Sequence, residues 1–249
     1  MPAFPPRPNG PDAESPLDAA VRAALATAAY ALVHTAFASH RAKRLAADLA
    51  GEEVARGWYR LAYNAQAVAG LGLLGAYVWR HRGPFVWHTQ GPARTGLRVL
   101  QGVAIGTFLK ALWDAGLGDL SGARPARDYL LGRPLRPVPD GQGPLEDDAG
   151  HPAPRGISLH TRQPANAFIV PVLWVVPGAR AGWVGMSVAF TAYAVLGSWS
   201  SQRRLRARWG AEYAAYEASG VPFLVPTAHV VEGARAPAFG DETGAERAA

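Results

Sequence analysis

Three clusters of polar residues lie within or beside the long apolar runs of the chain. His34 lies inside the apolar run Ala23 to Ser39, where a titratable ring either binds a ligand, which makes His34 a candidate for contacting a substrate or a cofactor, or satisfies a neighbouring helix. The second cluster, His160 to Asn166, contains Arg162, whose guanidinium could hold a carboxylate or phosphate or anchor a helix to lipid headgroups. The third cluster, Ser200 to Arg204, leads into a basic amphipathic helix, a pattern more typical of scaffolding at a membrane surface.

Several other kinds of site lack support in the sequence. The 249 residues include no cysteine, which excludes disulfides, thiolate zinc sites and a cysteine nucleophile. Glycine-rich nucleotide-binding loops and the short metalloprotease and serine-hydrolase motifs are absent, and we expect no metal site. The excess of 25 Lys and Arg over 19 Asp and Glu comes without a nucleic-acid motif, so we expect no nucleic-acid partner.

Long apolar runs must position the three clusters. The runs Ala23 to Ser39, Trp58 to Trp79 and Leu97 to Leu117 are apolar nearly all round, as helices solvated by lipid are. The stretch Ala165 to Trp199 is too long for one helix across a bilayer core of about 30 Å, and a break at Pro177 divides it into two antiparallel helices. We therefore expect an all-α, polytopic membrane protein with about five transmembrane helices, including a tight helical hairpin, and a C-terminal cytoplasmic amphipathic helix.

The basic residues indicate how these helices are oriented. If the five runs alternate across the membrane, most Lys and Arg residues fall on the side that holds the C-terminus. The more basic side is the cytoplasmic one. We expect an integral protein of the inner or cytoplasmic membrane, whose partners are the lipid bilayer and a small or lipophilic substrate. Lys110 and Asp114 lie within the third run, at the i and i+4 spacing that lets opposite charges pair on a helix.

The composition also divides the chain into segments. The polar, Pro-rich N-terminal segment 1–22 lacks the apolar core of a signal peptide, so we expect no cleavable one. The membrane domain covers residues 23–226 and includes a stretch rich in Pro, Gly and acidic residues, about 121–160, which is predicted to be a long flexible loop. Residues 227–249 are predicted to be a disordered C-terminal tail.

A series of motifs carries a family resemblance. In chain order they are His34-Thr35 with Ala38-Ser39, Arg162-Gln163-Pro164, Trp174 to Pro177, Gln202-Arg203-Arg204, Gly210 with Tyr213 and Tyr216, and Val221-Pro222 with Pro226. In this order and spacing they resemble the membrane superfamily of isoprenylcysteine carboxyl methyltransferases, methanethiol S-methyltransferases and NnrU-like proteins. The N-terminal motif is similar to the NnrU-like and methanethiol branches.

The resemblance implies a cytoplasmic pocket for S-adenosylmethionine, built from the hairpin entrance, the segment after the last span and the C-terminal helix. A lipophilic or small thiol or carboxylate acceptor would attack the methyl group of a sulfonium. This reaction requires alignment in a dry pocket but no nucleophile of the protein, and no catalytic residue is assigned. The implied cofactor-binding residues are Arg162, Gln163, Pro164, Asn166, Gln202, Arg203, Arg204 and Tyr213.

Two positions depart from the pattern of the family. Gln163 stands where the family has histidine, and Ser201 and Gln202 stand where methyltransferase members have a glutamate pair. Glutamine donates and accepts hydrogen bonds, but it neither titrates nor offers a carboxylate. Two alternatives to a divergent S-adenosylmethionine-dependent methyltransferase-like protein therefore stay open. One is a non-catalytic NnrU-like membrane accessory protein, and the other is a haem-linked isomerase relative with His34 as the candidate axial ligand.

Overall fold

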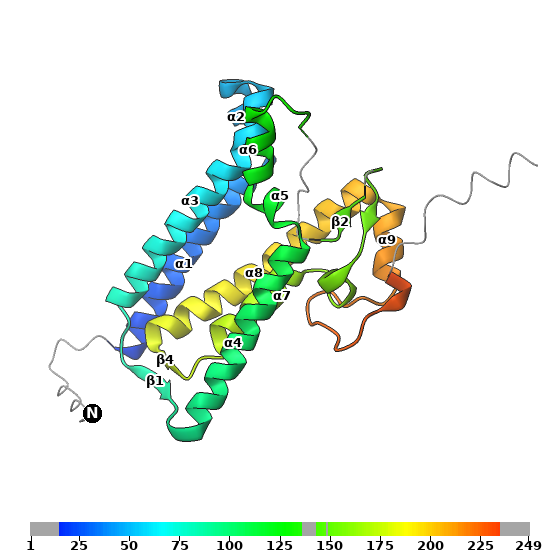
Figure 1. Ribbon diagram of the computed structural model, residues 1–249. Coiled ribbons are helices and arrows are strands. Elements are labelled where there is room, and N and C mark those ends of the chain that lie inside the picture. The colour runs from blue at the N-terminus through cyan, green and yellow to red at the C-terminus, as the bar shows by residue number, and fades with distance from the viewer. Residues whose placement is uncertain (1–14, 136–142, 148, 235–249) are drawn as a thin grey trace, which may run out of the picture.

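The structure of the protein, a computed structural model, describes residues 15–135, 143–147 and 149–234 (Figure 1). Parts of three predicted segments, the Pro-rich start, the flexible loop and the tail, therefore lie outside the described residues. Most of the residues that are described belong to helices, as the sequence predicts for an all-α protein.

Three of the described helices are long and apolar enough to cross a membrane, namely α1 (Pro16–Ala38), α3 (Glu52–Arg80) and α8 (Ala181–Trp209). The other two expected spans correspond to α4 (Gly91–Asp114) and α7 (Pro164–Trp174). α7 is shorter than a span, and α4 is more polar because it carries several Arg and Lys residues. Helices able to cross a membrane are thus present, whereas five spans and a transmembrane hairpin are not confirmed.

Capping residues mark where the first helices begin and end. The Ser15 side chain accepts a hydrogen bond from the backbone N–H of Asp18 (3.0 Å), and Pro16 occupies the first turn. α1 therefore begins within the predicted N-terminal segment, before the apolar run itself. Ser39 follows the last residue of α1 and caps α2 (His40–Ala50), a short basic helix that the sequence did not indicate.

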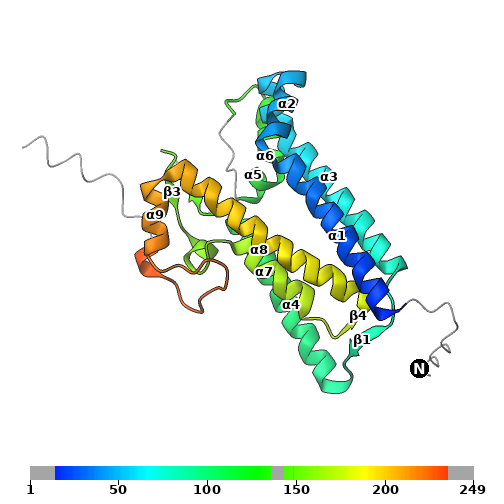
Figure 2. The same cartoon turned by 180° about the vertical axis from the view of Figure 1, so that it is seen from behind.

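The long helices form a bundle organised around α8 (Figures 1 and 2). α1 packs along α8, α3 lies beside α1 on one side, and α7 and α4 lie on the other side. Gly185 permits the close approach of α8 to α1, because a Cβ atom there would overlap the backbone carbonyl oxygen of Ala20. Large apolar side chains are exposed along α1, α3 and α4, as lipid-facing surfaces require. Examples are Leu25, Leu32, Leu73, Val103 and Leu109.

A pair of short antiparallel strands joins two helix connections at one end of the bundle. β1 (Phe85–His88), between α3 and α4, pairs with β4 (Gly178–Arg180), between α7 and α8. The Pro177 carbonyl oxygen accepts a hydrogen bond from the Thr89 N–H (2.8 Å), which extends this pairing. The chain divides into α7 and α8 around Pro177 as predicted, but the connection is an extended segment that pairs with β1 rather than a tight turn.

The predicted flexible loop contains regular structure in the part that is described. The helix that carries Tyr129, α6 (Ala123–Leu130), packs against the start of α3, because a Cβ atom at Gly57 would lie 2.8 Å from the Tyr129 side chain. Because this helix has a fixed partner, the start of the predicted loop is folded. From the end of α4 onward the elements are α5 (Leu117–Ser121), α6 (Ala123–Leu130), β2 (Leu145–Glu146), β3 (Pro152–Ala153) and η1 (Gly156–Leu159), a 3-10 helix.

α8 runs without interruption from the apolar part of the bundle into the basic segment and ends at Trp209. The basic amphipathic helix predicted over about Gln202 to Ala218 is therefore divided, because its first half is the last part of α8. A separate helix, α9 (Ala211–Ala218), follows Gly210, whose positive φ of 50° favours glycine.

Two apolar cores hold the elements together. One lies between the long helices and is formed by Ala23, Leu74, Val78, Leu173 and Met186. The other surrounds α9 and is formed by Leu159, Leu205, Trp209, Tyr213, Tyr216, Val221 and Ala234. The described start of the predicted tail is therefore packed, since its last described residues form η2 (Glu232–Ala234) and contribute to this second core.

Candidate functional site

The predicted cofactor residues lie where the entrance of α7, the last part of α8 and α9 meet. Pro164 is the first residue of α7, so Arg162 and Gln163 precede its first turn. The Arg162 backbone N–H donates a hydrogen bond to the Pro222 carbonyl oxygen (2.9 Å). The C-terminal motif that contains Pro222 thus fixes the backbone that carries Arg162.

A carboxylate that the motifs did not indicate, Glu217 of α9, is the centre of this region. It accepts hydrogen bonds from Arg162 Nη1 and Gln202 Nε2, and also from Arg206 through Nε (2.7 Å) and Nη2 (3.0 Å). The side chains of Arg162 and Glu217 are only 14% and 16% exposed, so this ion pair is largely shielded from water. Two guanidinium groups share one carboxylate, which leaves a net positive charge.

Four of the residues predicted to bind the cofactor carry buried polar atoms that have no hydrogen-bond partner among the described residues. Gln163 is completely buried, and its amide oxygen and amide nitrogen both lack a partner in that part of the chain. Buried polar groups are nearly always paired in folded proteins, so this concentration indicates a ligand or ordered water. The other unpaired atoms are Arg162 Nε, Gln202 Oε1 and the Tyr213 hydroxyl. Together with Glu217, these four residues are called the Glu217 cluster.

Tyr213 closes the cluster on the side of α9. Its ring is fully buried and stacks on Trp209, with 6.0 Å between the ring centroids. Burial raises the pKa of Tyr213 to about 12, although the nearby Arg162 guanidinium opposes the shift. The hydroxyl therefore stays protonated at neutral pH and can donate a hydrogen bond. Burial also raises the pKa of Tyr216, whose hydroxyl donates to the Ser158 carbonyl oxygen (2.5 Å).

Two more predicted residues lie beside the Glu217 cluster and have structural roles. Pro164 is buried and starts α7. Asn166 Nδ2 donates a hydrogen bond to Ser198 Oγ (2.8 Å), which joins α7 to α8 one helical turn before Gln202. Asn166 is thus close to the cluster, and the hydrogen bond that the structure gives it holds two helices together.

The last two predicted residues, Arg203 and Arg204, point away from the cluster. Arg203 is exposed and lies over the Trp199 ring, at 5.5 Å from its centroid. Arg204 Nη1 donates a hydrogen bond to Ser200 Oγ (2.8 Å). Successive residues of a helix project in different directions, so three consecutive side chains cannot all face one ligand.

His34 lies in a second cluster, inside the bundle. Its Nε2 atom is 2.6 Å from the Tyr63 hydroxyl of α3, and its ring lies 5.7 Å from the Tyr30 ring and 6.1 Å from the Tyr193 ring. Tyr193 precedes Gln202 on α8 by nine residues, about 13 Å along a helix. The structure therefore does not bring His34 into the Glu217 cluster. Tyr30, His34, Tyr63, Gln66 and Tyr193 are called the His34 cluster.

The charged pair of α4 has a structural role. Lys110 and Asp114 pair as predicted, with 2.8 Å between Nζ and Oδ2. Asp114 also accepts a hydrogen bond from the Ile157 N–H (3.0 Å), which ties the end of α4 to η1. Among the residues that the structure describes, no group of three or more His, Asp or Glu is placed to hold a metal ion.

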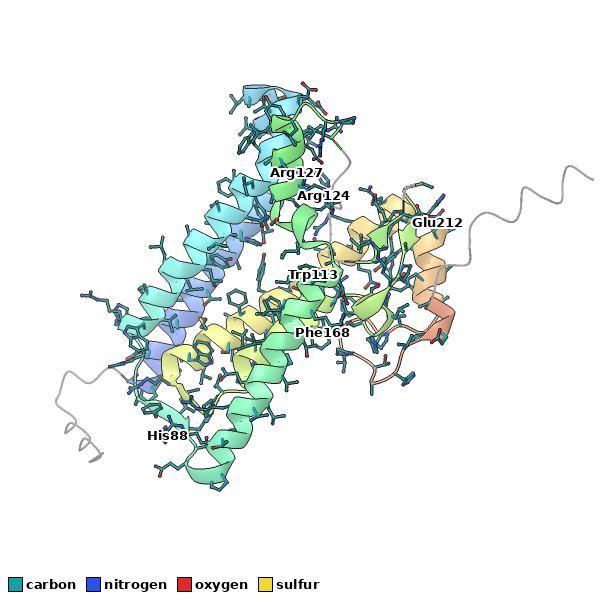
Figure 3. All side chains as sticks on the ribbon, in the orientation of Figure 1. His88, Trp113, Arg124, Arg127, Phe168 and Glu212 are labelled. Atoms are coloured by element: carbon teal, nitrogen blue, oxygen red, sulfur yellow. The ribbon has the colours of Figure 1, made fainter. Side chains whose placement is uncertain are left out.

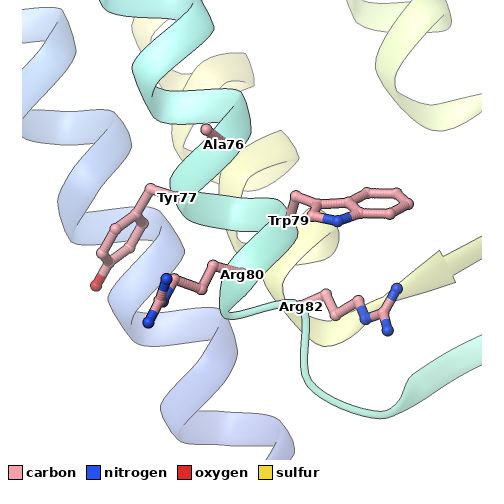
Figure 4. Close-up of a pocket in the computed structure, with 5 residues that line it drawn as sticks. All are labelled: Ala76, Tyr77, Trp79, Arg80 and Arg82. Atoms are coloured by element: carbon pink, nitrogen blue, oxygen red, sulfur yellow. The ribbon is translucent and has the colours of Figure 1, made fainter.

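A shallow hollow of about 630 Å³ lies at the end of α3. In Figure 4, Tyr77 and Arg80 lie on one side of the helix, while Trp79 and Arg82 lie on the other. The two guanidinium groups thus do not converge on one ligand. The fifth lining residue is Ala76.

Comparison with known proteins does not place this chain in a family. No protein-family model, no curated protein and no solved structure matches it. The motif resemblance therefore stays a prediction, and any functional proposal depends on the geometry of the Glu217 cluster.

Proposed function

We propose that the chain is a divergent membrane-embedded methyltransferase-like protein that binds S-adenosylmethionine and methylates a lipophilic or small thiol or carboxylate acceptor. The proposal depends on one observation, the concentration of buried polar atoms in the Glu217 cluster that lack partners among the described residues. The residues that carry these atoms are four of those to which the resemblance assigns the cofactor.

The chemistry of these groups fits the carboxylate end of an amino-acid ligand. The Arg162 Nε–H can donate to a carboxylate, and the net positive charge that Arg162 and Arg206 leave beside Glu217 attracts one. The Gln163 amide can donate to one atom of a ligand and accept from another. When bound, the cofactor supplies a methyl group on a sulfonium, whose transfer to a carboxylate or thiolate leaves the electron pair on the departing sulfur. The residues of the chain bind and orient the reactants and exclude water.

The position of the cluster suits an acceptor that arrives from the lipid. The cluster lies at the basic end of α8, beyond its apolar part, so a cofactor from the aqueous phase and a lipophilic acceptor can meet there. Figure 3 places Arg124, Arg127 and Glu212 toward this end of the molecule and His88 at the opposite end. We propose that this basic end, with the C-terminus, faces the cytoplasm in an inner or cytoplasmic membrane. α4 and α7 would then complete a five-helix membrane domain.

Calorimetry tests the proposal directly. S-adenosylmethionine is titrated into the full chain in detergent, and we expect a dissociation constant in the micromolar range. Tyr213→Phe removes one ligand contact and should weaken binding about tenfold, and Gln163→Leu removes two and should weaken binding more than Tyr213→Phe does. No binding to the wild-type chain contradicts the proposal.

Ser187→Ala is the matched control for these two variants. Ser187 is also fully buried on α8, and its Oγ likewise has no partner among the described residues. It lies fifteen residues before Gln202, about 22 Å along the helix, so its loss should leave cofactor affinity unchanged. An equal loss of binding in Ser187→Ala would assign the effect to general destabilisation and contradict the proposed site.

An absorbance scan of the same sample tests the two alternatives. The surroundings of His34 do not fit an axial haem ligand, because its Nε2 atom already faces the Tyr63 hydroxyl at 2.6 Å. A Soret band that His34→Ala removes would nevertheless favour the haem-linked relative. The absence of both a Soret band and cofactor binding would favour the non-catalytic accessory protein.

A further inference from the structure

A second set of unpaired polar atoms lies inside the membrane-crossing helices. His34 Nδ1 of α1 and Gln66 Oε1 of α3 are both buried, and neither has a hydrogen-bond partner within the described ranges. Polar groups inside a bilayer are expensive unless they are paired. Two such atoms in neighbouring spans therefore indicate a ligand or a water molecule.

The side chains of His34 and Gln66 both lie near the ring of Tyr30. This ring stacks on His34, and its hydroxyl donates a hydrogen bond to the Ala67 carbonyl oxygen of α3 (3.3 Å). A Cβ atom built at Gly70 would lie 3.2 Å from the Tyr30 ring and 3.6 Å from Gln66 Nε2. The Tyr30 ring and the Gln66 side chain are therefore close to each other, and from this shared neighbour we infer that His34 and Gln66 line one site.

The hydrogen bond between His34 and Tyr63 determines which hydrogen-bond donor and acceptor this site presents to a ligand. Tyr63 O–H is a better donor than a neutral imidazole N–H, so we assign it as the donor to His34 Nε2 (2.6 Å). The imidazole proton then sits on Nδ1, which becomes a donor without an acceptor. Gln66 Oε1 is an acceptor without a donor. A group that accepts one hydrogen bond and donates another would satisfy both atoms.

The position of the cluster restricts the rest of the ligand. His34 and Tyr193 are half-buried, and the neighbouring side chains Leu32, Val33 and Phe37 of α1 are exposed. A molecule with an apolar body can therefore lie against α1 in the lipid while its polar end reaches the cluster. Its polar end must be neutral, because a buried charge without a counter-charge is costly in a bilayer.

We propose that the His34 cluster binds, in the plane of the membrane, the hydroxyl or protonated carboxyl end of a long-chain lipophilic molecule. The polar end accepts a hydrogen bond from His34 Nδ1–H and donates one to Gln66 Oε1. Tyr30 and Tyr193 enclose it with their rings. This inference does not depend on the methyltransferase proposal, because it uses none of the residues of the Glu217 cluster.

Photo-crosslinking to the full chain in lipid nanodiscs tests the inference. The probes are hexadecanol, palmitic acid and hexadecyl methyl ether, each with a diazirine in the alkyl chain, and mass spectrometry of peptides locates the label. We expect the alcohol or the acid to label α1 and α3 near His34, and excess unlabelled alcohol or acid to compete. The ether cannot donate a hydrogen bond, so we expect it to label about fivefold to tenfold less. Whichever of hexadecanol and palmitic acid labels the chain more strongly identifies the end group of the ligand.

Three variants sharpen this experiment. His34→Phe keeps a ring and Gln66→Leu keeps a similar volume, and each should reduce labelling about fivefold to tenfold by removing one hydrogen bond. Thr27→Val is the control on α1, since the Thr27 hydroxyl donates only to Ala23 of its own helix (2.7 Å) in the described structure. Labelling in Thr27→Val should match wild type.

Two results would overturn the inference. Equal labelling by the ether and the alcohol in the wild-type chain would mean that the two atoms bind water or nothing, and that the probes only follow the lipid. A similar loss of labelling in Thr27→Val and His34→Phe would mean that the effect comes from disturbed helix packing. The comparison of probes needs no variant, so it holds even if a variant fails to fold.

Discussion

The Glu217 cluster and the His34 cluster both bury polar groups, but the groups differ in charge. Both contain buried polar atoms that have no partner in the described chain. The Glu217 cluster contains a carboxylate and the Arg162 guanidinium, and Arg206 beside it also pairs with Glu217, whereas the His34 cluster contains only neutral groups. The difference follows from their surroundings, because the first lies beyond the apolar part of α8 and the second lies between helices that can cross a membrane.

This difference has an energetic consequence. A buried ion pair is strongly destabilised when one partner is removed, since the remaining charge has no counter-charge. A neutral hydrogen bond between membrane helices contributes much less, because the groups find other partners when it breaks. The Glu217 cluster should therefore be sensitive to loss of charge, and the His34 cluster should be sensitive to helix packing.

The largest effect is expected from Glu217→Gln. This change leaves Arg162 and Arg206 without their shared anion, so it should lower the free energy of unfolding by about 3 kcal/mol. Unfolding in detergent, followed by circular dichroism, measures the change. Glu212→Gln on the same helix is the control, because Glu212 is more exposed and should contribute less than about 1 kcal/mol. Equal losses in the two variants would contradict the importance of the buried charge.

A smaller effect is expected from Gly185→Ala. The added Cβ atom would overlap the Ala20 backbone, so α1 must move away from α8. This movement should lower the free energy of unfolding by about 2 kcal/mol. Because the His34 cluster needs α1 and the Glu217 cluster does not, lipid labelling should fall while binding of S-adenosylmethionine persists. Gly72→Ala is the control, since a Cβ atom there meets no described atom within 4 Å. Loss of both activities together would show that the Glu217 cluster also needs the contact between α1 and α8.

The smallest effect is expected from Tyr63→Phe. It removes the hydroxyl that faces His34 Nε2, and hydrogen bonds between membrane helices contribute about 0.6 kcal/mol on average. A double-mutant cycle with His34→Phe measures this coupling. Tyr77→Phe, an exposed position farther along α3, should have almost no effect. A coupling as large as the loss in Glu217→Gln would remove the distinction between the clusters.

Part of the fold could be predicted from hydropathy alone. The apolar runs that became α1, α3 and α8 are visible because lipid-facing helices are apolar on most sides. The pairing of Lys110 with Asp114 follows from the i and i+4 spacing. The strand pairing of β1 with β4 could not be predicted, because it joins segments that are far apart in sequence and individually too short to show a pattern.

The candidate site was predictable only in part. The motifs placed Arg162, Gln202 and Tyr213 in one region, and the structure brings them together around Glu217. Glu217 itself was missed because a glutamate on a short helix usually faces water. The one feature of the sequence that could have indicated Glu217 is its position four residues after Tyr213, which puts both side chains on the same face of α9.

The continuity of α8 has a consequence for how the two clusters communicate. Tyr193 of one cluster and Gln202 of the other are carried by the same unbroken helix. A rotation of this helix about its axis moves both side chains, so a ligand that prefers one rotation at Tyr193 alters the affinity at Gln202. Thermodynamic reciprocity requires the same factor in the opposite direction. The chain would then be allosteric, and membrane composition would set the affinity of a water-soluble ligand, as titrations in nanodiscs with and without hexadecanol can measure.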